Sequence, residues 1–283
     1  MVLDGARALA LPTKLGQSLS VNHIQDGSFH HWQSLDHRGD VWFECTFDLS
    51  LTHIIHTSDT KRAQTLLLIL QYIKVRQEHL FINVIQFITK LDFNPEWGLG
   101  SSSTFIHNLA QWSGVDAFDL LQNSFGGSGY DVAVAIANAP IVYQIDAQKS
   151  QWEKVAINWH FKDQLWFVYL NQKQNSREGI RQYKAHPANQ KQIEQISNIS
   201  EQLLSCNDLT AFEKLISKHE SLISNIIQLK TVKEKLFSDY PGSVKSLGAW
   251  GGDFVLATGS DAPAYFKAKA YETVISYQDF IKD

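Results

Sequence analysis

The sequence predicts an α+β protein with two domains, and three observations support this fold class. A chain of 283 residues with 44% hydrophobic content can bury one large core or two modest ones. In the last third of the chain, strand-like segments, a glycine-rich loop and a helical pattern follow one another in an arrangement that suits an α+β domain. A soft boundary near residue 160 separates residues 1–160 from residues 161–283.

The amino-terminal part combines strand patterns with amphipathic helices. Residues 59–76 are expected to form a helix, because Ala63, Leu66, Leu67, Leu70 and Ile73 make an apolar stripe at helical spacing. The polar residues 27–40 are expected to form a hairpin-like loop. The other expected elements are strands at residues 16–24, 41–47, 80–89, 140–145 and 152–158, and helices at residues 102–113 and 116–123.

The carboxy-terminal part begins with a strand pattern and continues with long helical ones. The expected elements are strands at residues 165–170, 254–258 and 273–277, helices around residues 193–203, 212–227 and 262–271, and a turn at residues 240–242. His219 falls on the apolar stripe of the helix at residues 212–227, so we expect a packed, hydrogen-bonded histidine. His30, His31 and His37 lie in or beside the loop at residues 27–40 without metal-binding spacing, and are expected to titrate as loop side chains.

Charge and cysteine content exclude several classes of protein. The net charge is -4, and the basic residues are dispersed, which is not typical of a protein that binds nucleic acid or a membrane surface. Cys45 and Cys206 form neither a disulfide framework nor a metal-binding pair, so a reducing cytoplasm is the expected compartment. No apolar run approaches the roughly 18 residues of a membrane span, and the first residues do not resemble a signal peptide.

The segment from Asn94 to Thr104 is the strongest local signal in the chain. It reads Asn-Pro-Glu-Trp-Gly-Leu-Gly-Ser-Ser-Ser-Thr, between an expected strand and an expected helix. Gly98 and Gly100 allow a tight turn, while the following serines supply hydroxyls and a helix cap. The free amides of the first helical turn favour an anion, most readily a polyphosphate. The same pattern also fits an ordinary capped helix after a flexible loop.

Two more glycine-rich segments follow, at residues 126–133 and 248–254. Together the three segments resemble the GHMP small-molecule kinases, named for galactose, homoserine, mevalonate and phosphomevalonate kinases. The first segment is similar to that family's Pro-x-x-x-Gly-Leu-Gly-Ser-Ser phosphate loop, the second to its Ser-Gly-x-Asp catalytic segment, and the third to its Gly-Ala-x-Gly-Gly loop. Their order and spacing agree with the family over nearly the whole chain. Other nucleotide loops, Gly-x-x-x-x-Gly-Lys-(Ser/Thr) and Gly-x-Gly-x-x-Gly, do not occur.

The resemblance implies an ATP-dependent phosphotransferase with bound Mg²⁺. The implied fold has a ribosomal protein S5 domain 2-like amino-terminal domain, which binds ATP, and a ferredoxin-like carboxy-terminal domain. Asp131 is implied as the general base, although an aspartate there could also brace the adjoining helix. Ser102 is implied as the magnesium ligand. The residues implied to bind ATP and its phosphates are Gly98, Leu99, Gly100, Ser101, Ser102, Ser103, Gly248, Gly251 and Gly252.

The sequence departs from the family pattern in three places. Residues 2–12 resemble only the tail of the first motif, without its strand and lysine, and we expect the natural start to lie further upstream. The glutamate that mevalonate kinases carry eleven residues before the catalytic aspartate is Leu120 here, and the adjacent Asp119 is expected to point elsewhere. Trp250 replaces a small residue in the third segment.

The resemblance leaves the phosphate acceptor open. Mevalonate and phosphomevalonate, intermediates of isoprenoid precursor synthesis, are the expected acceptors, and Gly-Gly-Asp at residues 251–253 is similar to the phosphomevalonate kinase branch. A sugar or homoserine kinase, a catalytically idle relative that binds a metabolite or partner, and a diphosphomevalonate decarboxylase are alternatives. A homodimer is one option for its assembly. The expected substrate contacts are Lys173, Ser176, Arg177 and Asp253, with Arg181 and Lys245 as further cations that also fit ordinary surface charges.

Overall fold

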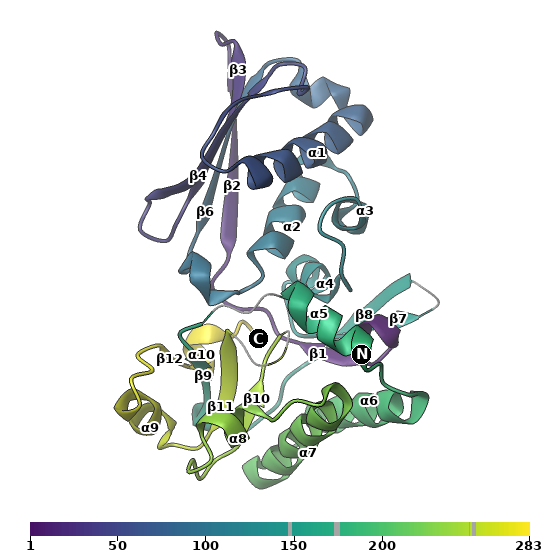
Figure 1. Cartoon of the computed structure of the whole chain (residues 1–283), viewed down its shortest axis with the longest axis vertical. Helices are drawn as coiled ribbons and strands as arrows, with labels where there is room; N and C mark the ends of the chain where they lie inside the picture. The colour runs from purple at the N-terminus through teal and green to yellow at the C-terminus, as the bar shows by residue number, and fades with distance from the viewer. Residues whose placement is uncertain (147–148, 173–175, 249, 251–252) are drawn as a thin grey trace. The chain divides into compact units, whose positions relative to one another are not determined.

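The computed structural model describes residues 1–146, 149–172, 176–248, 250 and 253–283, with the backbone alone for residues 176–178 (Figure 1). Contacts divide the chain into two compact units. Unit 1 holds residues 1–14, 96–99 and 137–283, and unit 2 holds residues 15–95 and 100–136. The division into domains at residues 1–160 and 161–283 stays a prediction. The boundaries of the two compact units differ from it, because the strand at residues 8–10 pairs with the strand at residues 141–146.

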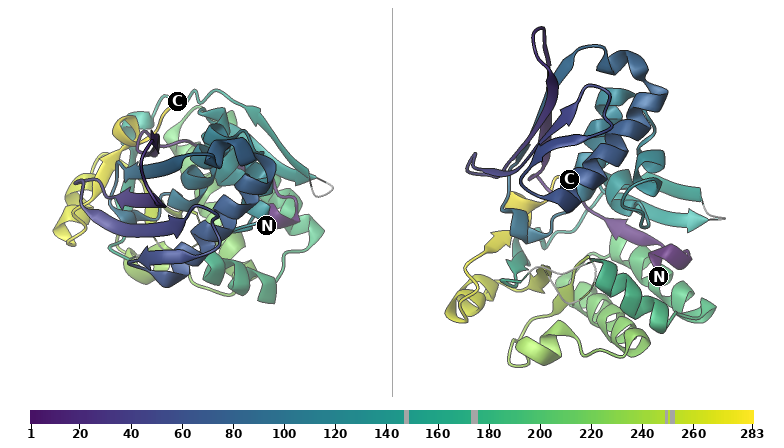
Figure 2. Two further views of the ribbon diagram at one scale, coloured as in Figure 1. Left: turned by 90° about the horizontal axis from the view of Figure 1, so that it is seen from above. Right: turned by 45° about the horizontal axis from the view of Figure 1, so that its top comes forward.

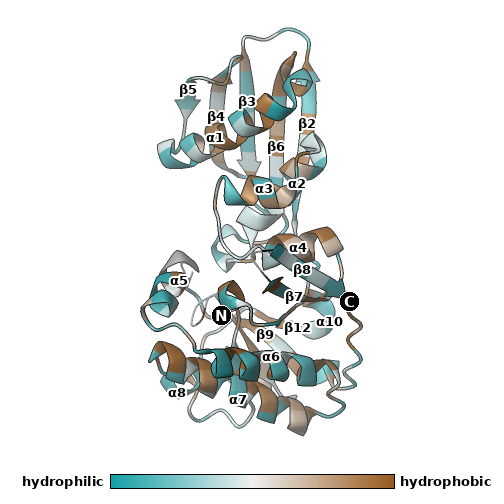
Figure 3. Ribbon diagram, turned by 90° about the vertical axis from the view of Figure 1, so that its right-hand side faces the viewer, coloured by the Kyte–Doolittle hydropathy of each residue, from teal (hydrophilic) through white to brown (hydrophobic). Residues whose placement is uncertain are grey.

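Unit 2 is built on a five-stranded sheet in the order β2-β6-β3-β4-β5. Strands β3 and β6 are parallel, and the other neighbours are antiparallel. Figure 3 shows α1, α2 and α3 on one face of this sheet. The strands are β2 (Gln17–Ile24), β3 (Phe29–Leu35), β4 (Val41–Asp48), β5 (Ile54–Thr57) and β6 (Val84–Leu91), and the helices are α1 (Thr60–Arg76), α2 (Ser101–Ser113), α3 (Ala117–Gln122), α4 (Tyr130–Ala137) and the 3-10 turn η2 (Glu78–Phe81).

The core of unit 2 lies between the sheet and these helices. The predicted helix at residues 59–76 is confirmed as α1, whose first turn is capped by the Asp59 side chain accepting from the Arg62 amide. Alternate residues of β4, including Phe43, Cys45 and Phe47, are buried in this core. The strand predicted at residues 80–89 begins later, at Val84, because the preceding residues form the turn η2.

The loop predicted at residues 27–40 is wrong, because most of it is strand β3. Its alternate residues His30, Trp32 and Ser34 are buried on the core face. Two of these side chains hydrogen-bond inside the unit: the Ile85 amide donates to His30 Nδ1 at 3.0 Å, and the Thr89 hydroxyl donates to Ser34 at 2.9 Å. His30 is therefore a core residue, and burial lowers its pKa.

Unit 1 contains two further sheets. One is three-stranded, in the order β1-β7-β8, and the other is four-stranded, in the order β10-β11-β9-β12, with every neighbouring pair antiparallel. The strands are β1 (Ala8–Ala10), β7 (Ile141–Asp146), β8 (Lys149–Lys154), β9 (Leu165–Tyr169), β10 (Val244–Ser246), β11 (Phe254–Thr258) and β12 (Val274–Ser276). The helices are α5 (Ser176–Ala185), α6 (Gln190–Leu204), α7 (Leu209–Ile227), α8 (Val232–Leu236), α9 (Ala262–Ala268) and α10 (Tyr277–Phe280), with 3-10 turns at η1 (Val2–Asp4), η3 (Pro95–Trp97) and η4 (Lys162–Gln164).

The four-stranded sheet has the chain order strand, helices, strand, strand, helix, strand. This order, together with the antiparallel arrangement β10-β11-β9-β12, is the ferredoxin-like topology predicted for the carboxy-terminal domain. The long amphipathic helices α6 and α7 lie side by side (Figures 1 and 2). Over the part of the chain that the structure describes, no helix is both long enough and apolar enough to cross a membrane.

Candidate nucleotide-binding and catalytic site

The first glycine-rich segment ends in an open helix start. Gly98 and Gly100 have positive φ angles of 64° and 70°, which glycine adopts without strain. Gly100 is the N-cap of α2, and its carbonyl accepts from the amides of Ser103 and Thr104 at 2.9 and 3.1 Å. The prediction that a serine caps this helix is therefore wrong, since glycine has no capping side chain. The amides of the first turn remain directed toward the space in front of the helix.

Polar contacts fix the first turns of α2 on strand β2. The Thr104 hydroxyl donates to Gln17 Oε1 at 3.1 Å, and the Asn108 side-chain amide donates to the Gln17 carbonyl at 2.7 Å. Ile106 and Leu109, on the other side of the helix, are fully buried. The Ser102 side chain, at the tip, is exposed. The helix start is thus anchored, while a hydroxyl stays available to a ligand.

Asp131 lies in the first turn of α4, directly after the second glycine-rich segment. The helix begins with the Ala133 amide donating to the Gly129 carbonyl at 2.9 Å, and Val132 is buried in the core of unit 2. Gly129 has a φ of 80°, and a Cβ there would lie 2.9 Å from the Phe118 ring. Glycine is therefore required at this position to bring the turn close to α3.

The Asp131 carboxyl has an unusual protonation equilibrium. Burial raises its pKa to about 6, and a hydrogen bond from the Tyr130 hydroxyl partly opposes this shift. The Tyr130 pKa is raised well above its usual value, first by the charge of Asp131, so the phenol stays a hydrogen-bond donor. A carboxylate with a raised pKa is a stronger base than a solvated aspartate, which suits proton abstraction near neutral pH.

Unit 2 holds both the serine turn and the candidate base. Helices α2 and α4 pack against the same core, and Phe105, one turn after Ser102, contacts Phe125 with ring centroids 6.3 Å apart. Unit 1 holds Gly98, Leu99, Gly248 and Asp253. Lys173, Gly251 and Gly252 lie outside the described residues, as do the side chains of Ser176 and Arg177 at the start of α5.

The first and third glycine-rich segments meet in unit 1. A Cβ built on Gly98 would overlap the carboxylate of Asp253, so this side chain packs directly on the glycine backbone. Aromatic residues next to both positions hold the contact: Trp97 packs edge-to-face on Phe254 with ring centroids 5.7 Å apart. The Tyr169 hydroxyl donates to the Glu96 carbonyl at 3.0 Å. Sequence reasoning places Asp253 near a substrate but does not pair it with Gly98.

Leu120 occupies the position, eleven residues before Asp131, at which the family resemblance would place a glutamate. Leu120 is buried in the core of unit 2, and the neighbouring Asp119 is exposed. Within the described ranges, no group of three or more histidine, cysteine, aspartate or glutamate side chains is placed to bind a metal ion. Any magnesium here would need ligands from a bound phosphate and water, which that ion accepts.

Trp250, a described residue of the third segment, is partly buried. It has a positive φ of 55°, and its side chain packs against a cluster of apolar residues from helices α5, α6 and α7. That cluster includes Tyr183, Ile193, Ile223 and Ile227. The bulky side chain of Trp250 is thus accommodated by packing on these helices.

Lys245 forms an ion pair with the buried Glu220. It is therefore not an ordinary surface charge, which is one of the two expectations from the sequence. Its ammonium lies 3.4 Å from Glu220 Oε1 of helix α7 and donates to the Ser246 carbonyl at 3.1 Å. Burial raises the Glu220 pKa, and Lys245 opposes this shift. His219, beside Glu220, is packed as predicted, but its Nδ1 has no hydrogen-bond partner among the described residues.

We expect Lys245→Met to destabilise the protein by about 3 kcal/mol, because it leaves the Glu220 charge buried and unpaired. Without Lys245 the Glu220 pKa rises further, so the folded state binds a proton that the unfolded state releases near its ordinary pKa. The loss should therefore be smaller at pH 5 than at pH 8. Urea denaturation at both pH values measures it. Lys214→Met, on the exposed face of α7, serves as the control; an equal loss in both variants would contradict the pairing.

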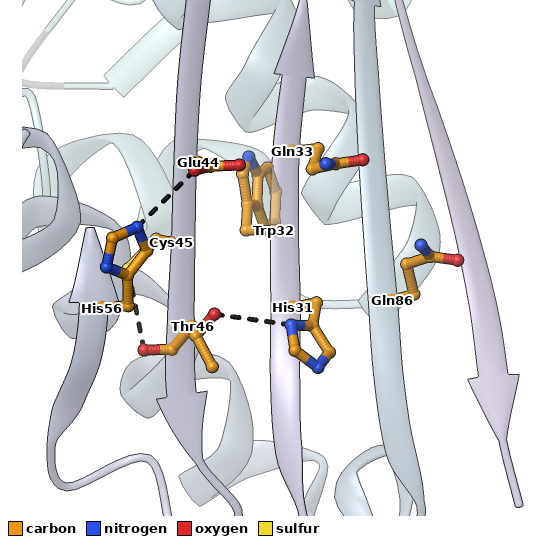
Figure 4. A pocket seen from close by; sticks show the side chains of 8 residues that line it. All are labelled: His31, Trp32, Gln33, Glu44, Cys45, Thr46, His56 and Gln86. Atoms are coloured by element: carbon orange, nitrogen blue, oxygen red, sulfur yellow. Dashed lines mark hydrogen bonds and ion pairs between the residues drawn. The ribbon is translucent and has the colours of Figure 1, made fainter. Parts of the chain in front are cut away.

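A shallow polar pocket lies on the sheet face of unit 2 opposite the helices (Figure 4). Its volume is about 160 Å³, and strands β3, β4, β5 and β6 line it. His56 Nε2 lies 3.6 Å from Glu44 Oε1, and His31 Nδ1 lies 3.4 Å from the Thr46 hydroxyl. His31 is therefore a strand residue and not a loop histidine. Each histidine has a partner of its own, so the pair does not converge on one point.

No protein-family model and no curated protein sequence matches this chain. Solved structures match it over nearly its whole length. Mevalonate kinase of Methanococcus jannaschii has a TM-score of 0.63 at 15% identity, covering 96% of this chain and 90% of that one. Phosphomevalonate kinase of Streptococcus pneumoniae, in complex with phosphomevalonate and AMPPNP, has a TM-score of 0.64 at 16% identity, covering 95% and 90%. Galactokinase of Lactococcus lactis, complexed with galactose, has a TM-score of 0.61 at 11% identity, covering 94% and 83%.

These similarities confirm the predicted fold class. The chain has the mixed α+β, two-domain fold of the GHMP kinases. Of the segments that suggested this fold from the sequence, the first leads into the start of α2, the second leads into α4, and Asp253 of the third directly precedes strand β11. The three matched enzymes are named for different acceptors, so one fold serves several small-molecule kinases.

Proposed function

We propose that the protein is an ATP-dependent small-molecule kinase of the GHMP family. The observation that carries this proposal is the presence, in unit 2, of both an open helix start at Ser101–Ser103 and the carboxylate of Asp131, whose pKa is raised to about 6. A helix start without a side-chain cap suits a polyphosphate, and a basic carboxylate suits the activation of an acceptor hydroxyl. The fold, common to kinases of several acceptors, supports the same reaction class.

In this proposal each group has a limited task, because phosphoryl transfer depends mainly on positioning and charge stabilisation. The backbone of residues 98–103 would hold the β and γ phosphates, with Gly248, Gly251 and Gly252 supplying a further backbone turn. Asp131 would accept the proton of the attacking hydroxyl. Ser102 would offer its exposed hydroxyl to the Mg²⁺ that accompanies ATP, an ion that offsets the charge of the phosphates.

Mevalonate and phosphomevalonate are the proposed acceptors, in isoprenoid precursor synthesis. Structures of enzymes named for both acceptors share this fold. Lys173, Ser176, Arg177 and Asp253 are the proposed substrate contacts. Galactokinase shares the fold as well, which keeps a sugar kinase as the second candidate, beside homoserine. The third candidate is a catalytically idle relative. It is favoured by the buried Leu120, which occupies the position of the mevalonate kinase glutamate.

A coupled assay of ADP release tests the proposal directly. The protein would be supplied with ATP, Mg²⁺ and, in turn, mevalonate, phosphomevalonate, galactose and homoserine. Turnover of either of the first two acceptors supports the full proposal, while turnover of galactose or homoserine alone supports the family and overturns the acceptor. ATP binding without turnover of any acceptor would favour the idle relative.

A further inference from the structure

Gln17 is a polar residue on the face of strand β2 that packs against the helices of unit 2. Residues two apart on a strand share a face, and Leu19 and Val21 of β2 pack against the core. Gln17 occupies the preceding position of this face, where it is half-buried. Because a buried amide requires hydrogen-bond partners, the facing helix must supply them.

Helix α2 supplies these partners from one face. Thr104 and Asn108 are four residues apart, so their side chains lie one above the other on the helix. The Thr104 hydroxyl donates to Gln17 Oε1 at 3.1 Å, and the Asn108 side-chain amide donates to the Gln17 carbonyl at 2.7 Å. The same hydroxyl lies 3.4 Å from the Gly100 carbonyl and 3.2 Å from the Ser101 carbonyl. Thr104 thus joins strand β2 to the residues that open the helix.

The apolar contacts of α2 hold the helix on the sheet without a preferred direction. Phe105 packs edge-to-face on Trp32 with ring centroids 5.5 Å apart, and Ile106 is fully buried. Hydrophobic attraction of this kind is non-directional, whereas a hydrogen bond weakens steeply when its distance or angle departs from the optimum. The bonds to Gln17 therefore fix where the first turn of α2 lies along strand β2.

We propose that Gln17 is a positioning residue for the phosphate-binding start of α2, an inference that rests on the proposed kinase function. The amides of Ser101–Ser103 would bind phosphate oxygens through directional hydrogen bonds, so a displaced first turn binds them less well. Thr104 follows these serines directly and connects them to Gln17. Gln17 acts through Thr104, without a contact of its own to the nucleotide.

Isothermal titration calorimetry with ATP and Mg²⁺ tests this role without relying on turnover. Gln17→Met keeps the length of the side chain and removes the acceptor, while Thr104→Val keeps the shape and removes the donor. Each variant should bind ATP about 10-fold more weakly than the unaltered protein, because ATP must then supply the order that one hydrogen bond provides. The combined variant should bind no more weakly than either alone, since both substitutions remove the same bond. Thr104→Ser, which keeps the hydroxyl, should bind ATP as the unaltered protein does.

Two controls separate positioning from a general loss of stability. Gln86→Met makes the same chemical change on the opposite face of the sheet. Ser113→Ala removes a buried hydroxyl that donates to the Leu109 carbonyl at 2.7 Å, at the far end of α2. Both controls should keep the ATP affinity of the unaltered protein, although Ser113→Ala should lower the melting temperature.

Distinct outcomes overturn the inference and the function. If ATP affinity follows the melting temperature across all variants, Gln17 has a structural role only. Additive losses in the combined variant would mean that Gln17 and Thr104 act separately. If both single variants bind ATP as tightly as the unaltered protein, the inference fails while the kinase proposal stands. Absence of ATP binding to the unaltered protein would overturn the proposed function and, with it, the inference. The two substitutions break the bond from opposite sides, so either one decides the test should the other variant not fold.

Discussion

Asp131→Asn is expected to lower kcat for an alcohol acceptor by roughly 10²- to 10⁴-fold, the usual contribution of a positioned general base. Asparagine keeps the shape of the side chain but cannot accept the hydroxyl proton. ATP affinity should change little, because the phosphates are proposed to be held by the backbone of residues 98–103. Steady-state kinetics with mevalonate, together with ATP titration, measure the two effects separately. An equal loss in ATP affinity would indicate that Asp131 braces the site and does not act as the base.

The pH dependence of the unaltered enzyme provides a second test of the same residue. Because the base must be ionised, kcat/KM for the acceptor should fall as the pH drops below about 6, and not near the ordinary pKa of an aspartate. The acceptor should be an alcohol, since a phosphate monoester has a pKa of its own near 6. Asp119→Asn, on the exposed surface of α3, should keep the same profile.

The raised Asp131 pKa should also affect stability, but in the opposite direction to activity: the free energy of unfolding should fall as the pH rises. The folded state holds a proton at pH values where the unfolded chain has already released it. The contribution of Asp131 to stability is therefore present below its ordinary pKa of 3.8 and is lost as the pH rises through about 6. Relative to Asp131→Asn, the unaltered protein should lose melting temperature over this interval.

The sequence predicts the elements whose apolar residues recur with a regular period. Helix α1 is an example: a stripe of five apolar residues places it almost to the residue. Strand β3 is missed because His30 and Ser34, polar residues, occupy its inward positions. Their hydrogen-bond partners, Ile85 and Thr89, lie 55 residues away in the sequence, where no local pattern reveals them. Polar residues satisfied by distant partners thus conceal the alternation of a strand.

In the candidate site, too, short motifs reveal the local features, whereas contacts between segments far apart in the sequence are not revealed. The glycines, serines and Asp131 are recognised from short motifs, because tight turns and helix starts are encoded locally. The capping residue is misassigned, since serine is the commoner cap by composition while the structure uses Gly100. The contact between Gly98 and Asp253 and the pair of Lys245 with Glu220 depend on tertiary packing, so they become visible only when distant segments are brought together.

Gly98→Ala is expected to destabilise the protein by about 2 to 5 kcal/mol. A left-handed φ of 64° costs an L-residue about 1–2 kcal/mol, and the new methyl group must also displace the Asp253 carboxylate, which adds about 1–3 kcal/mol. Gly100→Ala is the matched control: its φ of 70° carries the same strain, but nothing lies within 4 Å of the added Cβ. Urea denaturation gives the free energy of unfolding of both variants. The loss in Gly100→Ala measures the backbone strain, and the additional loss in Gly98→Ala measures the steric overlap with Asp253.

A double-mutant cycle then assigns the additional loss to one contact. Asp253 has a φ of 21°, a conformation that glycine tolerates, so Asp253→Gly removes the carboxylate without adding backbone strain. Combining Gly98→Ala with Asp253→Gly should restore the stability lost to steric overlap. The remaining loss should then equal that of Gly100→Ala. The coupling between the two substitutions should be about 1–3 kcal/mol, whereas substitutions at separate sites add independently. Equal losses for Gly98→Ala and Gly100→Ala, with no coupling to Asp253, would mean that the first and third glycine-rich segments do not touch.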